Sequence, residues 1–183
     1  MEVVHTTPAE FSTDRLDLRR IVHTDLDHLA ELYSVPSVLH FLGAEGWSTG
    51  GRPPSLDRTR AHLAAIEKHW EVYGFGRSAV IERVTGDFVG LVGLQVREPW
   101  DDIQLDFLIA RDRQRRGYGV EAGRVWVDWA RREDLTDRLV VATDARHEAA
   151  FRTARALGFR PDWGSPPAWA SGRVVHRLAD PAS

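Results

Sequence analysis

Ile103-Gln-Leu-Asp-Phe-Leu-Ile-Ala110, followed by Arg111-Asp-Arg-Gln-Arg-Arg-Gly-Tyr-Gly-Val-Glu-Ala-Gly123, is typical of a strand, a basic turn and the start of a helix. Apolar and mostly polar residues alternate through the first part, which is the two-residue period of a strand. Gly117 and Gly119 allow a close approach of the backbone to a ligand. A turn that opens a helix directs several backbone N–H groups, and the positive end of the helix dipole, at one point. The stretch therefore predicts an anion site, above all for a phosphate.

The whole chain has the composition of a globular protein and is predicted to form one domain. It has 183 residues, of which 43% are hydrophobic and 28% charged, and a net charge of −3. This charge gives no argument for nucleic-acid binding, because the basic residues of the central turn are a local feature. The chain contains no Cys, which excludes disulfides, thiolate nucleophiles and cysteine-ligated zinc. No apolar run approaches the ~18–20 residues that span a bilayer, and we expect a cytoplasmic protein.

Two helices are expected before the central strand. Thr24 is predicted to cap the first, and Pro36 to prevent its continuation. Ser55 is predicted to cap the second, and Gly74 to end it. Its expected buried face consists of Leu56, Thr59, Leu63, Ile66, Trp70 and Tyr73.

The remaining segments favour a mixed sheet with helices on both faces. Residues 1–12 are expected to be a loose arm, and residues 164–183 a variable C-terminal segment. Residues 43–54 have the composition of a long loop, in which Trp47 either faces the substrate or covers the core. A helix is expected over residues 146–157, and further strands over residues 15–22, 77–84, 87–96, 138–143, 158–161 and 173–178; the second and third of these would form an antiparallel hairpin.

The order of elements and the central motif resemble the GNAT superfamily of acyl-CoA N-acyltransferases, especially the Rim-type branch of ribosomal-protein N-terminal acetyltransferases. The likeness runs from about Thr13 to Pro161. The family's Gln/Arg-x-x-Gly-x-Gly/Ala motif stands here as Gln114-Arg-Arg-Gly117-Tyr-Gly119. The resemblance implies a GNAT-like α/β fold with a twisted, mostly antiparallel central sheet. It also implies acetyl-CoA as co-substrate, an amine acceptor and a homodimer. No metal is expected, because the histidines fit no metal-ligand spacing and the chain has no Cys.

The resemblance also assigns residues to the cofactor. Backbone N–H groups of about Arg115 to Val120 would hold the pyrophosphate, and the backbone from Leu108 to Ala110 would pair with the pantetheine arm. Arg113, Arg115 and Arg116 are expected either to reach CoA phosphates or to face solvent. The cofactor-binding residues predicted in this way are Leu108, Ile109, Ala110, Gln114, Arg115, Arg116, Gly117, Tyr118, Gly119 and Val120.

The sequence departs from the Rim-type pattern at the positions that carry catalysis. Gln104 and Asp106 stand where relatives carry a Glu and a Gly, and the two-residue period places both on one face of the strand. Asp106 is therefore either a base or amine-binding carboxylate, or a partner of a nearby arginine. His147 stands where relatives often carry Asn, and is either a hydrogen-bonding or acid group or a surface histidine at a helix start. Ala150 replaces a Ser, and no Tyr follows Tyr118, so His147, His176 or water would serve as the acid if one is needed.

Two functions of different classes follow from these observations. The first is an acetyl-CoA-dependent N-acetyltransferase that moves an acetyl group directly to a primary amine, either a peptide N-terminus or a small molecule. The second is an acyl-CoA-binding sensor or regulatory module with little turnover, which the altered catalytic positions keep open. A site for another nucleotide is disfavoured, because the chain has no Gly-Lys-Ser/Thr phosphate loop.

Overall fold

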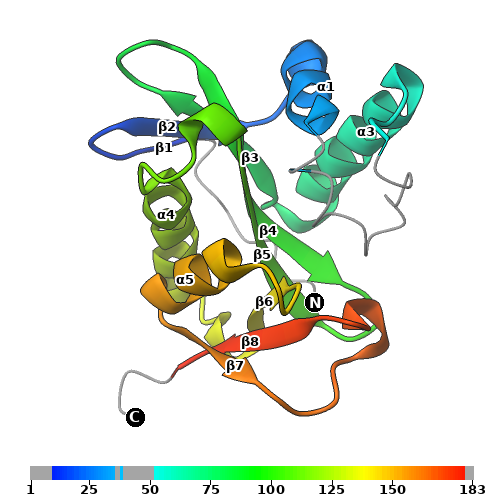
Figure 1. The fold of residues 1–183 in the computed structure, drawn as a ribbon, viewed down its shortest axis with the longest axis vertical. Coiled ribbons are helices and arrows are strands. Elements are labelled where there is room, and N and C mark those ends of the chain that lie inside the picture. The colour runs from blue at the N-terminus through cyan, green and yellow to red at the C-terminus, as the bar shows by residue number, and fades with distance from the viewer. Residues whose placement is uncertain (1–9, 36–37, 39–51, 180–183) are drawn as a thin grey trace.

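The computed structural model describes residues 10–35, 38 and 52–179, which form one continuous eight-stranded sheet flanked by helices. The strands are β1 (Glu10–Ser12), β2 (Leu16–Arg20), β3 (Arg77–Glu82), β4 (Phe88–Arg97), β5 (Asp102–Ile109), β6 (Leu139–Thr143), β7 (Phe159–Asp162) and β8 (Val174–Leu178). The helices are α1 (Leu26–Ser34), α3 (Leu56–Tyr73), α4 (Tyr118–Arg132) and α5 (Glu148–Ala156). In Figure 1, α1 and α3 lie on one side of the sheet, and α4 and α5 lie on the other.

The sheet is mostly antiparallel, as the sequence predicts. Its strand order is β1-β2-β3-β4-β5-β6-β8-β7, and the pair β5–β6 is parallel. The expected hairpin of β3 and β4 is present, and β5 follows antiparallel to β4. Because β5 and β6 run parallel, a crossover must join them, and α4 is that crossover.

The buried faces of the helices meet in an aromatic cluster. The ring of Trp126 in α4 lies edge-on to those of Trp70 in α3 and Trp129 in α4, at centroid distances of 5.9 Å and 5.6 Å. Phe11 of β1 packs on the same ring at 5.2 Å. This cluster packs α4 against α3 and β1.

The N-terminal region differs from expectation in two places. Residues 10–12 belong to the stretch expected to be a loose arm, but they form β1, which pairs with β2 through Phe11 and Leu18. Residues 1–9 lie outside the described residues. Thr24 does not cap α1: it lies within a short 3-10 turn, and Asp25 is the N-cap residue. The Asp25 carboxylate accepts hydrogen bonds from the Arg19 guanidinium and the Val22 N–H. These bonds fix the conformation of the segment that joins β2 to α1.

The second helix follows its sequence signals closely. The Ser55 hydroxyl accepts a hydrogen bond from the Arg58 N–H at 3.3 Å, and Gly74 ends the helix with a φ of 74°. Leu56 is 48% exposed, although it was expected on the buried face, because it is the first helical residue and lies beyond the contact with the sheet. Most of the loop expected over residues 43–54, including Trp47, lies outside the described residues.

Candidate functional site

A cleft opens where β5 and β6 diverge. Within these strands the two are paired through Ile103 with Leu139 and Gln104 with Val140, and they separate beyond that point. The cleft has a volume of about 900 Å³. Its walls come from residues 105–109 of β5, from residues 141–143 of β6 and Asp144 after it, and from the start of α4 and α5 on one face of the sheet. On the other face Tyr33 of α1 also lines it. The cleft therefore passes through the sheet and reaches both faces.

The edge of β5 that faces this cleft offers backbone hydrogen-bonding groups. The N–H of Ala110 donates to Val89 O of the β4 side at 2.9 Å. Backbone groups alternate in direction along a strand, so those of Ala110 and Leu108 point to β4, and those of Phe107 and Ile109 point to the cleft. The carbonyl of Ile109 accepts from the Gln114 side chain at 2.9 Å. The backbone N–H and C=O groups of Phe107 and Ile109 therefore face the cleft. Of the three predicted residues, Ile109 is the one with this orientation, whereas the backbone groups of Leu108 and Ala110 point to β4.

The start of α4 closes one end of the cleft. Gly117 is the N-cap residue with a φ of 83°, a conformation that glycine adopts without the steric penalty of other residues. Val120 N–H and Glu121 N–H both donate to Gly117 O. In the described chain the N–H groups from Arg115 to Gly119 have no backbone acceptor, as expected for the first turn of a helix. These five N–H groups and the helix dipole suit an anion.

Ion pairs fix the turn from outside. Glu121 accepts hydrogen bonds from Thr13 Oγ1 at 2.6 Å and from Arg15 Nε at 2.7 Å. Burial raises the pKa of Glu121, but the bonds from Thr13 and Arg15 outweigh it and the net pKa is lowered. Tyr118 donates its hydroxyl proton to Glu82. The hydrogen bond from Tyr118 is the main reason for the lowered pKa of Glu82.

The arginines of the turn have different partners. The Arg113 guanidinium lies 2.7 Å from Glu82 Oε2 and 2.6 Å from Asp87 Oδ2, so it holds the β3–β4 hairpin. Arg116 donates to Asp112 O at 3.4 Å and is not among the cleft-lining residues of the described chain. Arg115 lines the cleft with a φ of 65°. Arg152 of α5 and Arg173 line the same cleft, and neither residue was predicted to do so.

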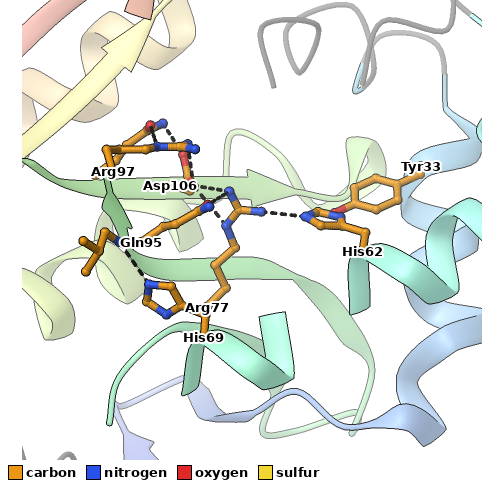
Figure 2. A network of polar contacts seen from close by, with 9 residues as sticks. Tyr33, His62, His69, Arg77, Gln95, Arg97 and Asp106 are labelled. Carbon is orange, nitrogen blue, oxygen red and sulfur yellow. Dashed lines mark hydrogen bonds and ion pairs between the residues drawn. The ribbon is translucent and has the colours of Figure 1, made fainter. Parts of the chain in front are cut away.

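On the opposite side of the sheet, Asp106 lies at the centre of a polar network (Figure 2). Asp106 Oδ2 accepts from Arg77 Nη2 at 2.5 Å and Nε at 3.0 Å, and lies 3.8 Å from Arg97 Nη2. Gln104 donates to Asp106 Oδ1 and accepts from Arg97 Nε at 2.7 Å. Gln104 and Asp106 thus share one face of β5, as predicted, and Asp106 is the partner of two arginines.

Four members of this network, Arg77, Arg97, His62 and Tyr33, were missed by sequence reasoning. Arg77 is 6% exposed, and its Nη1 donates to His62 Nε2 at 3.0 Å. His62 Nδ1 in turn lies 3.1 Å from Tyr33 Oη. Tyr33, Arg77 and Asp106 all line the cleft. The one available sequence signal was an arginine at the start of an apolar strand, since a buried guanidinium requires partners.

The two candidate acid histidines have different surroundings. His147 is the N-cap residue of α5 and lines the cleft, close to the buried Ala150. His176 of β8 is 1% exposed, and its Nε2 lies 2.8 Å from the hydroxyl of the cleft residue Thr143. Burial lowers the pKa of His176. His147 therefore borders the cleft directly, whereas His176 meets it through Thr143.

The acidic residues at the start of β5 are part of structural contacts. Asp101 accepts hydrogen bonds from Arg138. Asp102 accepts from Trp169 Nε1 at 3.0 Å, which fastens the segment before β8 to the sheet. Among the described residues, no group of three or more His, Asp or Glu side chains has a metal-binding arrangement, and no helix is long and apolar enough to cross a bilayer.

Solved structures share this fold along nearly the whole chain. An acetyltransferase from Agrobacterium tumefaciens superposes with a TM-score of 0.80 at 20% identity, covering 98% of this chain and 99% of its own. RimL, a ribosomal L7/L12 α-N-protein acetyltransferase in complex with coenzyme A, superposes with a TM-score of 0.71 at 17% identity, covering 92% and 93%. The ribosomal-protein-S5-alanine acetyltransferase from Vibrio fischeri gives 0.67 at 16% identity, covering 92% and 95%.

The sequence itself gives the family. Residues 15–160 match the family described as acetyltransferase (GNAT) domain, and this match includes β2 to β6, the turn before α4 and all of the cleft-lining residues named above except Arg173. The match contains the strand, basic turn and helix start formed by residues 103–123. The chain therefore belongs to the GNAT acetyltransferase family and is an acyltransferase.

Proposed function

We propose that the protein is an acetyl-CoA-dependent N-acetyltransferase that transfers the acetyl group directly to a primary amine. The observation that carries this proposal is the gap between β5 and β6, which leads from the start of α4 through the sheet to Asp106. The same cleft therefore joins the anion site at the start of α4 to the part lined by Asp106, Arg77 and Tyr33 on the other face of the sheet, which we call the polar chamber. RimL, a structural neighbour, is solved with coenzyme A, which is consistent with such a track.

The residues of the cleft fit an acyl-CoA. The N–H groups from Arg115 to Gly119 would bind the pyrophosphate at the start of α4. A side chain on Gly119 would point toward Ile109 and Thr153 at 3.6 Å and 3.8 Å, so glycine keeps this passage open. Phe107 and Ile109 would pair with the pantetheine amides as a neighbouring strand does. Arg115 and Arg152 would supply positive charge at the mouth of the cleft.

The chamber around Asp106 suits an amine that reacts in its neutral form. Two guanidinium groups, of Arg77 and Arg97, and one carboxylate, of Asp106, leave a net charge of +1 there. Positive charge disfavours the protonated amine and so favours the nucleophilic form. Asp106 Oδ2 already accepts two hydrogen bonds from Arg77, whereas Oδ1 accepts one from Gln104 and retains acceptor capacity. We therefore propose that Asp106 Oδ1 binds the amine N–H and that Gln104 orients the carboxylate.

Direct transfer requires only that the two substrates are held together. The amine attacks the thioester carbonyl, the tetrahedral intermediate expels the thiolate, and a proton passes from the amine to solvent. In our proposal His147 is the group of this chain placed to protonate the thiolate. The chain has no Cys, so no cysteine-bound acetyl intermediate is proposed.

A coupled assay tests the proposal. Purified protein is incubated with acetyl-CoA and a panel of peptides with free N-termini, amino acids, polyamines and aminoglycosides, and the release of CoA is followed. Amine-dependent CoA release is the expected result. Tight acetyl-CoA binding without release would favour the second function, a sensor or regulatory module, which the replacement of the relatives' Glu by Gln104 keeps open. Absence of acetyl-CoA binding would contradict both functions.

The acceptor class remains part of the proposal. We infer a peptide N-terminus from the Rim-type neighbours, with small amines as the alternative. The homodimer implied by the family resemblance is a separate prediction, which light scattering of the purified protein would test.

A further inference from the structure

A row of polar side chains runs from β5 to α1 across the chamber that the proposed function assigns to the amine. It consists of Asp106, Arg77, His62 and Tyr33, which come from β5, β3, α3 and α1 (Figure 2). The mechanism above uses only Asp106 and the charge of Arg77. The donor and acceptor at each hydrogen bond of the row indicate roles for His62 and Tyr33.

The direction is set by Arg77, which has five N–H donors and no acceptor. Its Nη1 lies 3.0 Å from His62 Nε2, so Nε2 must be the accepting nitrogen. A neutral imidazole then carries its proton on Nδ1, and this N–H donates to Tyr33 Oη at 3.1 Å. Since Tyr33 accepts from His62, the phenolic proton of Tyr33 is directed to a different acceptor.

Two side chains of the row, Arg77 and Tyr33, are held in place by their surroundings. Arg77 is 6% exposed and also donates to Asp106 and Gln95, so its side chain has little freedom to rotate. Tyr33 is 1% exposed and is one of the residues that line the cleft, so its ring is tightly packed beside the cavity. Such a group binds with little loss of side-chain entropy, because its rotamer is already fixed.

We propose that Tyr33 donates its hydroxyl proton to an oxygen of the amine substrate, and that His62 and Arg77 are positioning residues that keep the phenol in the donor state. This inference rests on the proposed function and deepens it. The substrate class that fits is an amine with a carbonyl oxygen near the reactive nitrogen. An alkylamine of the same shape lacks this oxygen and loses the hydrogen bond.

Two probe amines measure the contribution of Tyr33. Alanine amide has a carbonyl next to the amine-bearing carbon, and isopropylamine has the same branched amine without it. The ratio of their kcat/KM values is compared in the wild-type protein and in Tyr33→Phe, which cancels the different intrinsic reactivities of the two amines. A lost hydrogen bond should lower the ratio about 5- to 10-fold. The KM for acetyl-CoA should stay unchanged.

Two substitutions at His62 separate positioning from packing. His62→Gln retains an oxygen to accept from Arg77 and an N–H to donate to Tyr33, so it should largely preserve the ratio. His62→Leu retains a side chain of similar volume without either group and should lower the ratio toward that of Tyr33→Phe. A purely structural role for His62 would instead give the same ratio in both variants.

Nitrogen NMR tests the relay without any acceptor. Long-range ¹H–¹⁵N spectra of the imidazole should show His62 protonated on Nδ1 alone at pH 7.5 in the wild-type protein. Protonation on Nε2, or on both nitrogens, would overturn the inference.

The failure of this inference differs from the failure of the proposed function. If the wild-type protein releases CoA with alanine amide and the ratio is the same in Tyr33→Phe, only the role of Tyr33 is overturned. If no amine in the panel causes release of CoA by the wild-type protein, the proposed function fails, and the inference fails with it.

Discussion

Glu121 and Arg15, which are 106 positions apart in the chain, form an ion pair of 2.5 Å between Glu121 Oε2 and Arg15 Nη2. Arg15 immediately precedes β2, and Glu121 lies in the first turn of α4. Arg15 Nη1 also donates to Arg116 O at 3.0 Å. The N-terminal part of the sheet thus holds the proposed anion site from behind.

Glu121→Gln should lower the free energy of unfolding by about 1 kcal/mol or less, because the Arg15 side chain of this pair is half exposed and solvent screens the attraction. Urea denaturation measures the change. Asp128→Asn is the matched control on the same helix, since Asp128 forms an exposed pair with Arg131. An equal decrease in the free energy of unfolding in both variants would show that the contacts of Glu121 with Arg15 and Thr13 stabilise the fold no more than an exposed ion pair does.

Gly117→Ala should destabilise the protein by about 1–2 kcal/mol, because the φ of 83° at this position is unfavourable for a residue with a side chain. Gly119→Ala serves as the comparison: it lies two residues away in α4, and its added methyl group meets neighbours at ordinary contact distances. Thermal or urea unfolding of the two variants distinguishes them. Equal stabilities would mean that residue 117 does not need the left-handed conformation.

Stability should fall as the pH drops from about 6.5 to about 4, in part because of His69. Burial lowers the pKa of His69 from 6.5 to about 4. Its Nδ1 bonds to Phe75 O and its Nε2 accepts from Val96 N–H, so the folded protein needs the neutral ring. Between these pH values the unfolded chain binds a proton that the folded protein excludes, at a cost of up to about 3 kcal/mol.

The contribution of His69 is isolated by comparison with His69→Gln, which donates and accepts without titrating in this range. The buried His176 has a lowered pKa and acts in the same direction, but it is common to both proteins. Urea unfolding at pH 4.5 and at pH 7.5 should show a smaller pH effect in the variant. Identical pH effects would contradict the assignment.

Arg115→Ala and Arg113→Ala should have different effects: the first mainly on the affinity for acetyl-CoA, the second mainly on the Tm. Arg115 lines the cleft, and its removal should weaken acetyl-CoA binding about three- to tenfold, with a weaker dependence of affinity on salt. Arg113 also lines the cleft, but its guanidinium binds Glu82 and Asp87, so its removal should lower the Tm and weaken the affinity less than Arg115→Ala does. Calorimetric titration and thermal unfolding provide the two measurements. The opposite pattern would mean that Arg113 leaves its partners to bind phosphate.

Local patterns were sufficient to predict most elements. The alternation before Ala110 and the two glycines after it indicated β5 and the start of α4, and Ser55 and Gly74 indicated the ends of α3. The spacing of Gln104 and Asp106 placed both on one face, and their hydrogen bond agrees with that placement.

Contacts between distant parts of the chain could not be predicted in this way. Tyr33, His62 and Arg77 are separated by at least 15 positions, and their association depends on how α1 and α3 cross the sheet. Thr24 is a good capping residue in isolation, but Asp25 becomes the N-cap because Arg19 and Val22 supply its hydrogen bonds. The three residues of β1 carry too weak a pattern to be distinguished from an arm, and they are ordered by pairing with β2 and by packing on Trp126.

The short contact between β5 and β6 also has a mechanical consequence. Strands β1 to β5 form one hydrogen-bonded block, and β6 to β8 form another, and between these strands two residue pairs connect the blocks. The angle between the blocks can therefore change at Gln104 and Val140 without breaking a hydrogen bond inside either block. Widening of the cleft is then a rotation about a fixed point at its closed end, so the displacement is greatest at the mouth and smallest beside Asp106.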